Sequence, residues 1–369
     1  MHLSLVSSLD SQCRAAATAM VGQGHRDSVL VLHDLLPDGS VLRRIHFRGR
    51  LIERQERRLE HGCLSCTVRL DVIPTVREFL RAGCPHLTLG LPPGVAAAQV
   101  LEELGLGGLE GLRVDNLLVA VDPLELEEQI WDARTLYEAG FTALRGDDRI
   151  GGEFLVGEFA LSDTVLAVPG MSSLLSEPDD ERSPKREPWM QGVRLLGHLA
   201  PHATVLEPED DFLPGCHDHR EAFSRSRPGS VRVPVLDDPG DFRTVLHRLD
   251  RPLHPVRFHE SLPLMAQGVH WLRGNLRIAG AGAEPVALQG VGPRVWMEPA
   301  QAAPPAALLA GAADRSGVVA VTGRAEDVDQ AELTRLLDHC SLRDDELRLD
   351  HSRFPDTFGL AGPFSTNSE

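Results

Sequence analysis

Residues 3–21 read LSLVSSLDSQCRAAATAMV. The short apolar run Leu3–Val6 is typical of a buried strand, and the polar stretch Ser7–Gln12 is typical of a loop. The alanine-rich stretch Cys13–Val21 favours a helix. A strand, loop and helix at the start of the chain predict an α/β fold. The first loop would lie at the carboxyl end of a strand, where parallel sheets bind their ligands.

The same alternation continues along the chain. Four further apolar runs predict strands at Val29–Leu32, Leu87–Leu91, Asn116–Val121 and Thr164–Val168. Helices are predicted at Asp71–Ala82, Gly94–Leu104 and Pro123–Ala139. Strands that alternate with helices predict a parallel sheet with helices on both faces.

A second, smaller α/β domain is expected after a break in this pattern. The proline-punctuated stretch Ser176–Pro188 predicts a surface loop, and the irregular stretch Glu207–Gly229 follows it. Later apolar runs lie at Gly268–Ile278, Val286–Met297 and Gly317–Val321, with an amphipathic stretch at Asp327–His339. We therefore expect a first domain over 1–206, a linker over 207–250, a second domain over 251–350 and a tail over 351–369.

Composition narrows the classes of function. The 369 residues are 42% hydrophobic and 25% charged, as in an ordinary globular protein. A net charge of −17 argues against nucleic acid or an anionic membrane as partner. The first ten residues have no basic segment and only a short apolar run, so a cytoplasmic location is expected. The uncharged stretch Cys84–Leu101 contains three prolines and is not expected to span a membrane.

The strongest local motif is HGCLSCTVRLD at residues 61–71. Six cysteines in a long cytosolic chain indicate reduced thiols or metal ligands. Cys63 and Cys66 have the C-x2-C spacing that lets two thiolates chelate one soft or borderline cation, with other ligands completing the tetrahedron. The alternatives are two small buried residues, or a redox pair at the start of a helix.

This motif resembles the Gly-Cys-x-Cys-Cys-Thr-x-Arg-x-Asp signature of the CobW family of P-loop GTPases, which includes zinc metallochaperones. Gly197–Ala203 resembles the Leu-Asn-Pro-x-Ala stretch that closes the family's GTPase domain, and Arg251–His259 resembles the opening of its C-terminal domain. The similarity spans nearly the whole chain. It implies a P-loop NTPase-like sheet followed by a CobW C-terminal-like α/β domain.

The phosphate-binding loop departs from the family pattern. The family's Ser-Gly-x-Leu-Gly-Ala-Gly-Lys-Thr-Thr loop aligns with residues 7–16, and its three glycines are replaced by Ser8, Ser11 and Cys13. Arg14 stands at the lysine position, and Ala15 at the position of the magnesium-binding hydroxyl. Of these residues, Ser8, Ser11 and Arg14 remain as candidate nucleotide contacts. We also expect Arg14 and Asp10 to pair and close the loop.

Two further nucleotide motifs are missing. Residues 85–99 contain no acidic residue to organise magnesium and water. Pro169–Ser173 stands where the guanine-reading Asn-Lys-x-Asp motif belongs, and Lys185 is the only lysine in the chain. The sequence therefore predicts impaired or absent GTP hydrolysis. Neither GTP nor magnesium is expected to bind as it does in an intact P-loop GTPase. The alternative is a GTPase that uses Arg14 in place of lysine.

Two groups of residues are candidate metal ligands. Ser65 replaces the middle cysteine of the family signature, so Cys63 and Cys66 remain as primary ligands, with His61 as a possible third. Cys216, His217 and His219 lie within four residues and predict an auxiliary capture site. The alternative for this second group is a solvated polar loop.

Together these features predict a CobW-like metal-binding or metal-delivery accessory protein, with zinc as the leading metal. Its expected partner is a client metalloprotein or an intact CobW-type paralogue, with neither nucleic acid nor membrane involved. A third possibility is a non-catalytic interaction protein that binds neither metal nor nucleotide.

Overall fold

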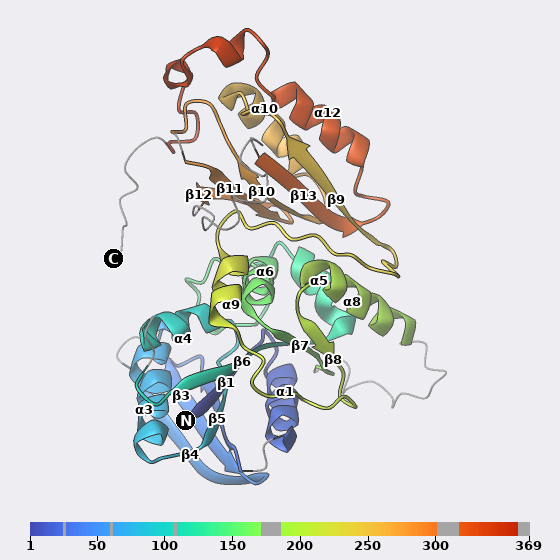
Figure 1. The fold of residues 1–369 in the computed structure, drawn as a ribbon. Coiled ribbons are helices and arrows are strands. Elements are labelled where there is room, and N and C mark those ends of the chain that lie inside the picture. The colour runs from blue at the N-terminus through green and yellow to red at the C-terminus, as the bar shows by residue number, and fades with distance from the viewer. Residues whose placement is uncertain are drawn as a thin grey trace. The chain divides into compact units, whose positions relative to one another are not determined.

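The computed structural model describes residues 1–24, 27–59, 62–105, 109–170, 186–282, 284–300 and 317–360. The chain divides into two compact units, Met1–Phe223 and Ser224–Glu369 (Figure 1). Each unit has its own sheet and its own hydrophobic core.

The first unit is built on an eight-stranded sheet with the order β4-β3-β2-β5-β1-β6-β7-β8. The strands are β1 His2–Ser7, β2 Val29–Leu35, β3 Ser40–Phe47, β4 Arg50–Arg58, β5 His86–Gly90, β6 Arg113–Val121, β7 Thr164–Ala167 and β8 Thr204–Leu206. The six strands from β2 to β8 in this order pair in parallel. On the central strand, Leu5 lies opposite Leu89 of β5 and Leu117 of β6. The five predicted strands of this sheet are confirmed.

The antiparallel hairpin of β3 and β4 extends this sheet beyond β2. The sequence interpretation assigns no strand to residues 40–58, because polar side chains on both faces hide the alternation typical of a half-buried strand. The sheet is therefore mixed rather than wholly parallel.

Helices cover both faces of the first sheet, as predicted. On one face, α1 Ser11–Gly24 buries Cys13, Ala17 and Val21 against residues of β1, β6 and β7. On the other face, α3 Ile73–Arg81 and α4 Ala97–Leu104 bury Val76 and Val100 against β1, β2 and β5. The alternation of Leu5 and Val6 along β1 supplies one side chain to each core.

The CxxC motif begins a helical stretch that is longer than expected. The stretch comprises α2 Leu64–Thr67, the π-helical turn η1 Val68–Val72 and then α3, so it starts seven residues before the predicted Asp71. A π-helical turn inside an α-helix is rare, and such turns frequently occur at functional sites. Here it contains Asp71, the last residue of the signature.

The helix predicted over Pro123–Ala139 ends early. Helix α5 covers Pro123–Trp131, and Asp132 is already extended. The Asp132 carboxylate accepts hydrogen bonds from the backbone N–H and side-chain Nε of Arg134, which stabilises a turn instead of another helical turn. Helices α6 Gly151–Leu161 and α8 Arg186–Leu199 pack against α5.

The second unit contains a five-stranded antiparallel sheet with the order β12-β11-β10-β13-β9. Its strands are β9 Phe242–Leu249, β10 His270–Leu276, β11 Val286–Val291, β12 Arg294–Pro299 and β13 Gly317–Arg324. Helices α10 Pro255–Met265 and α12 Gln330–Cys340 share one core with the sheet, and the short helices η2 Glu346–Arg348 and η3 His351–Arg353 follow. Strands β10 to β13 and helix α12 lie on segments that the sequence predicts, with β11 and β12 both in the single run Val286–Met297. Strand β9 was not predicted.

The division between the units differs from the expected linker over 207–250. Phe212 and Ala222 are buried in the cores of the first unit, so this part of the chain packs with it. After the helix α9 His219–Ser226, strand β9 pairs with β13 and belongs to the second sheet. Although residues 207–250 are irregular in sequence, their few buried apolar side chains place Phe212 and Ala222 in the first unit and β9 in the second.

No helix in the described parts of the chain is long and apolar enough to cross a membrane. The stretch Cys84–Leu101 instead forms β5, the loop after it and the first turns of α4.

Candidate functional site

The loop between β1 and α1 is closed by the side chain of Asp10. Its Oδ1 accepts hydrogen bonds from the backbone N–H groups of Gln12, at 2.5 Å, and Cys13, at 3.1 Å. In a phosphate-binding loop, N–H groups at this helix start bind an anion and the helix dipole favours it. Here the protein's own carboxylate occupies that role.

Arg14 does not pair with Asp10 in the way the sequence suggested. Its guanidinium is fully buried and its Nη2 donates to Oδ1 of Asp34 at 2.5 Å. Its Nη1 donates to the carbonyls of His33 and Leu91. The residue at the lysine position therefore joins α1 to the ends of β2 and β5.

Arg14 and Asp34 modify one another's titration. Burial lowers the pKa of the Arg14 guanidinium, and the Asp34 carboxylate partly offsets this effect. Burial would raise the pKa of Asp34, but the guanidinium groups of Arg14 and Arg44 hold it below its ordinary value. Arg44 donates from Nη2 to Oδ2 of Asp34 at 2.7 Å, so this carboxylate binds two arginines.

The other two candidate nucleotide contacts lie on the same loop. The buried Ser8 hydroxyl donates to the carbonyl of Ala120 on β6 at 2.7 Å, while its own carbonyl accepts from Gly94 N–H. Ser11 is the first residue of α1 and is exposed. Only Ser11 presents its side chain to solvent, because Ser8 is held inward by the neighbouring strand.

Three strand ends converge beside this loop. A Cβ at Gly170, after β7, would lie 3.1 Å from each of Asp10 Oδ2, Asp122 Oδ2 and Cys13 Sγ. Gly170 N–H donates to Asp122 Oδ2 at 2.9 Å, and burial raises the pKa of the Cys13 thiol. Two carboxylates and a buried thiol thus fill the region at the carboxyl ends of β1, β6 and β7.

Glu158 is a buried carboxylate that the sequence reasoning missed. It lies on α6 and accepts the N–H of Ala97, the first residue of α4, on both oxygens at 3.1 and 3.2 Å. Burial raises its pKa to about 7, against the opposing effects of the Ser7 hydroxyl, the Ala97 amide and Arg149. The only signal in the sequence is that Glu158, like Glu153, is an acidic residue within the largely apolar helix GGEFLVGEFAL.

The two thiols of the CxxC motif lie next to each other at a helix start. Cys63 is the N-cap of α2, and its Sγ accepts the backbone N–H of Cys66 at 3.2 Å. Hydrogen bonding to Cys63 raises the pKa of the Cys66 thiol, and burial adds to the effect. Both residues are partly exposed. Two adjacent thiols at a partly exposed helix start fit both the chelating and the redox interpretation of the motif.

Ser65 and Asp71 of the motif contact side chains of neighbouring elements. Ser65 is exposed and accepts a hydrogen bond from Gln99 of α4 at 2.8 Å. The last residue, Asp71, is buried, and its Oδ1 lies 3.4 Å from Nε2 of the fully buried His33 on β2. His61, the possible third ligand, lies outside the described residues.

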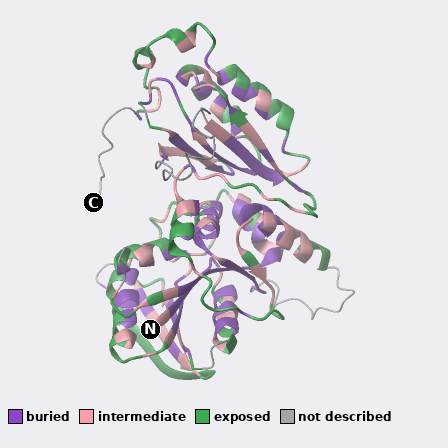
Figure 2. Cartoon of the chain, in the orientation of Figure 1, coloured by how far each residue is buried: buried purple, intermediate pink, exposed green. Residues whose placement is uncertain are grey.

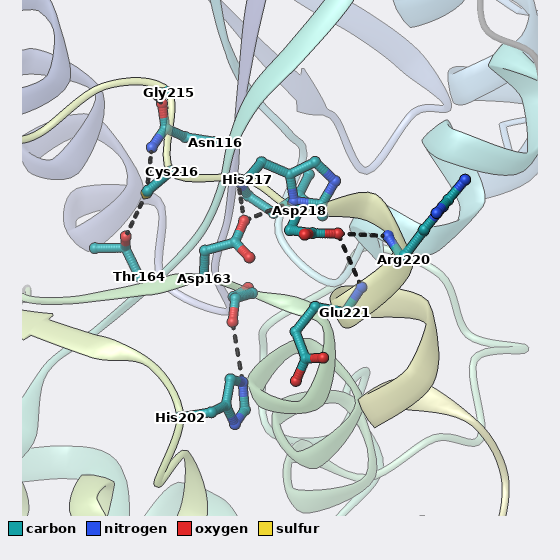
Figure 3. Close-up of polar contacts among 12 residues, drawn as sticks. Asn116, Asp163, Thr164, His202, Gly215, Cys216, His217, Asp218, Arg220 and Glu221 are labelled. Carbon is teal, nitrogen blue, oxygen red and sulfur yellow. Dashed lines mark hydrogen bonds and ion pairs between the residues drawn. The ribbon is translucent and has the colours of Figure 1, made fainter. Parts of the chain in front are cut away.

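The second cluster of candidate ligands is not assembled into one site (Figure 3). Cys216 turns toward Asn116, whose Nδ2 donates to its Sγ at 2.9 Å, while Nδ1 of His217 lies 2.7 Å from Oδ2 of Asp163. His219 begins α9 and stacks on Phe223. The adjacent residues Cys216 and His217 point to different partners, while the rings of His217 and His219 lie edge to face with their centroids 6.1 Å apart.

Across the described ranges, no three His, Cys, Asp or Glu side chains are grouped so that they could hold a metal ion. Among these residues, Cys63 and Cys66 are therefore a pair of adjacent thiols without a third such side chain beside them.

The chain is similar to known proteins over most of its length. Residues 242–341 match the cobalamin synthesis protein cobW C-terminal domain. The zinc chaperone Rv0106 of Mycobacterium tuberculosis is 25% identical over 313 residues, which cover 76% of this chain and 71% of that protein. The uncharacterized protein Mb0109 of Mycobacterium bovis shows the same identity and coverage.

Two solved structures align along most of the chain. The zinc-bound YjiA GTPase of E. coli is 12% identical, with a TM-score of 0.39 over 93% of this chain and 99% of that one. A zinc-bound triple mutant of YjiA gives a TM-score of 0.40 and 13% identity over the same shares. Residues 242–341 thus form a CobW C-terminal domain, and the chain is similar over 76% of its length to the zinc chaperone Rv0106.

Proposed function

We propose that this protein is a zinc-binding accessory protein that holds zinc for a client metalloprotein and does not hydrolyse GTP. The observation that carries the proposal is the adjacency of the Cys63 and Cys66 thiols at the partly exposed start of α2. Thiolates are strong zinc ligands, and the relative Rv0106 is named a zinc chaperone.

An incomplete ligand set suits delivery. Structural zinc sites are closed by four protein ligands, whereas two thiolates leave positions for water or for the ligands of another protein. His61, two residues before Cys63 in the sequence, is the nearest candidate for a third ligand. Zinc is here the cargo, and a client would complete its coordination during transfer. The cytoplasm, where thiols stay reduced, is the expected location.

Two features of the first loop support the absence of GTP turnover. The Asp10 carboxylate takes up the helix-start N–H groups that a phosphate would need, and it adds a repelling charge. The Arg14 guanidinium is already hydrogen-bonded to Asp34 and to the carbonyls of His33 and Leu91. Phosphoryl transfer depends almost entirely on the positioning of such groups.

A zinc titration against a chromophoric chelator, under reducing conditions and without nucleotide, tests the metal site. We expect wild type to bind one equivalent and Cys63→Ser/Cys66→Ser to lose it, because both primary ligands are gone. Cys84→Ser is the matched control, since Cys84 is a partly buried thiol bonded to the His86 carbonyl on β5. Equal zinc binding by wild type and the double variant would refute the proposal.

A separate assay tests the nucleotide. Magnesium-dependent GTP turnover and GTP binding by calorimetry are both expected to be at background for wild type. Turnover that disappears in Arg14→Ala, in protein that is shown by circular dichroism to be folded, would favour the GTPase alternative.

A further inference from the structure

The hairpin of β3 and β4 is strongly basic in an otherwise acidic chain. Residues 40–58 contain seven arginines against two glutamates, a net charge of +5, while the whole chain carries −17. The seven are Arg43, Arg44, Arg48, Arg50, Arg54, Arg57 and Arg58. A local field of this sign attracts acidic groups.

Strand β4 is an open edge of the sheet. It is the outermost strand in the sheet order, and all nine of its residues are exposed (Figure 2). Among the described strands, β4 pairs only with β3, so its outer N–H and C=O groups face solvent. A long exposed edge of this kind is a template for one more strand.

Some of the hairpin's arginines are already engaged. Arg43 binds Glu53, and Arg44 binds Asp34. Arg57 donates to the Leu70 carbonyl. By contrast, Arg50 and Arg54 form no ion pair with any residue that the structure describes. Two cations on the edge strand therefore remain available to an incoming acidic chain.

Apolar side chains accompany these charges. Leu51 is 52% exposed and Ile52 is 60% exposed, and both lie between Arg50 and Arg54 on the edge strand. The pairing with β3 shifts at this point, because Ile45 lies opposite Glu53 while His46 lies opposite Leu51. Ile52 is thus the extra residue of a β-bulge, a feature that turns a side chain outward.

We propose that β4 binds an extended acidic segment of another protein as a ninth strand of the first sheet. Main-chain hydrogen bonds along the edge would supply affinity. The register with β3 sets Arg50 on the face of Phe47 and sets Arg54, with Leu51, on the opposite face, so the incoming strand would present an acidic side chain on each face and an apolar side chain against Leu51. This surface does not depend on zinc, so it stands independently of the function proposed above.

Two other occupants fit less well. Antiparallel pairing of β4 with a second copy centred on Arg54 would set Arg54 against Arg54 and Arg50 against Arg58, and like charges opposite one another destabilise a sheet. Single-stranded nucleic acid would gain from aromatic side chains on which bases stack, and β4 has none. An acidic polypeptide uses both the exposed backbone and the arginines.

The position of β4 adds a geometric consequence. Strand β4 ends at Arg58, five residues before Cys63. Gly62 lies against the turn that precedes β3, since a Cβ on Gly62 would be 2.5 Å from the Cα of Gly39. A segment added along β4 therefore lies on the part of the sheet from which the chain enters the CxxC motif.

Fluorescence anisotropy tests the edge with a labelled ten-residue peptide of repeated Glu-Glu-Val-Val, which presents glutamates on both faces of a strand. We expect binding to the full-length protein that weakens at least tenfold in Arg50→Glu/Arg54→Glu, because two attractive pairs become repulsive. Arg243→Glu/Arg248→Glu is the charge-matched control, since both arginines are exposed on β9, the edge strand of the second sheet. This control should bind like wild type.

Three further measurements make the outcome decisive. The same peptide with N-methyl groups on alternate residues should lose binding, and hydrogen exchange of the β4 amides should slow with the unmodified peptide. The zinc titration should be unchanged in Arg50→Glu/Arg54→Glu, which separates this surface from the metal site. The proposal is overturned if no peptide binds at millimolar concentration, if the charge-reversed variant binds equally, or if an oligonucleotide of equal charge displaces the peptide as well as unlabelled peptide does.

Discussion

Nη2 of Arg14 lies 2.5 Å from Oδ1 of Asp34, and this pair connects the first turn of α1 to the end of β2. In a phosphate-binding loop, the basic residue at this position reaches the outer phosphates of the nucleotide. Here the longer, planar guanidinium reaches past the loop to a carboxylate and two carbonyls. The Arg14 side chain thus connects α1 to β2 and to the residue that follows β5.

Removing this guanidinium should destabilise the first unit. Arg14→Ala leaves the Asp34 carboxylate with one partner and two buried carbonyls with one donor fewer, so we expect a loss of about 3–5 kcal/mol in the free energy of unfolding. Arg44→Ala is the control, because Arg44 is one-third exposed and Arg14 would still hold Asp34, and it should cost about 1 kcal/mol or less. Urea unfolding followed by circular dichroism measures both, and equal losses would contradict this account.

The Asp10 carboxylate should act as a helix cap. Asp10→Ala removes the acceptor for two N–H groups at the start of α1 and should cost about 0.5–2 kcal/mol of stability. Asp10→Asn keeps an acceptor oxygen and should cost less. The same unfolding experiment compares them. If Asp10→Asn is less stable than Asp10→Ala, the hydrogen bonds of the cap do not account for the contribution of Asp10 to stability.

Glu158 should make stability depend on pH. Its pKa is raised by burial to about 7, above its ordinary value of 4.5, so the folded protein holds this proton more tightly than the unfolded chain does. Stability from this group is therefore fully present below about pH 4.5 and is lost as the pH rises to about 7. The difference corresponds to about 3 kcal/mol, and it stays lost above that range.

The variant Glu158→Gln tests this sign. Glutamine keeps an acceptor for Ala97 N–H but cannot ionise, so the decline in melting temperature between pH 5 and pH 7.5 should become shallower. Glu138→Gln is the matched control, because Glu138 is exposed and caps a surface turn through Thr135. A decline that is as steep in Glu158→Gln as in wild type would assign the pH dependence to other groups.

The central strands could be predicted because each is a mainly apolar, uncharged run that is buried on both faces, as in Leu87–Leu91 and Asn116–Val121. The β3–β4 hairpin could not, because Arg43, Arg44 and Arg54 are paired or exposed rather than buried by apolar neighbours. The early end of α5 depends on the local contact between Asp132 and Arg134, which helix propensities averaged over a stretch of sequence do not reveal.

Closeness in sequence predicted the adjacency of one pair of candidate side chains and not of another. The spacing of Cys63 and Cys66 was enough to place both thiols at one helix start. Spacing failed for Cys216 and His217, because His217 is held by Asp163, 54 residues away in the sequence. The roles of Asp34 and Glu158 depend on residues that only the fold brings near, namely Arg14 and Ala97.

A pair of helical glycines tests the packing of the first unit. Gly192 of α8 lies against α5, where a Cβ would be 2.0 Å from the Pro123 carbonyl oxygen, so even one methyl group must push the two helices apart. We expect Gly192→Ala to cost about 1–3 kcal/mol or more. Gly157 of α6 has no atom within 4 Å of its Cβ position, so Gly157→Ala should stabilise by about 0.5–1 kcal/mol through helix propensity alone. Urea unfolding of the two variants should thus give opposite signs, and two changes of the same sign would show that α5 and α8 are not in the close contact described here.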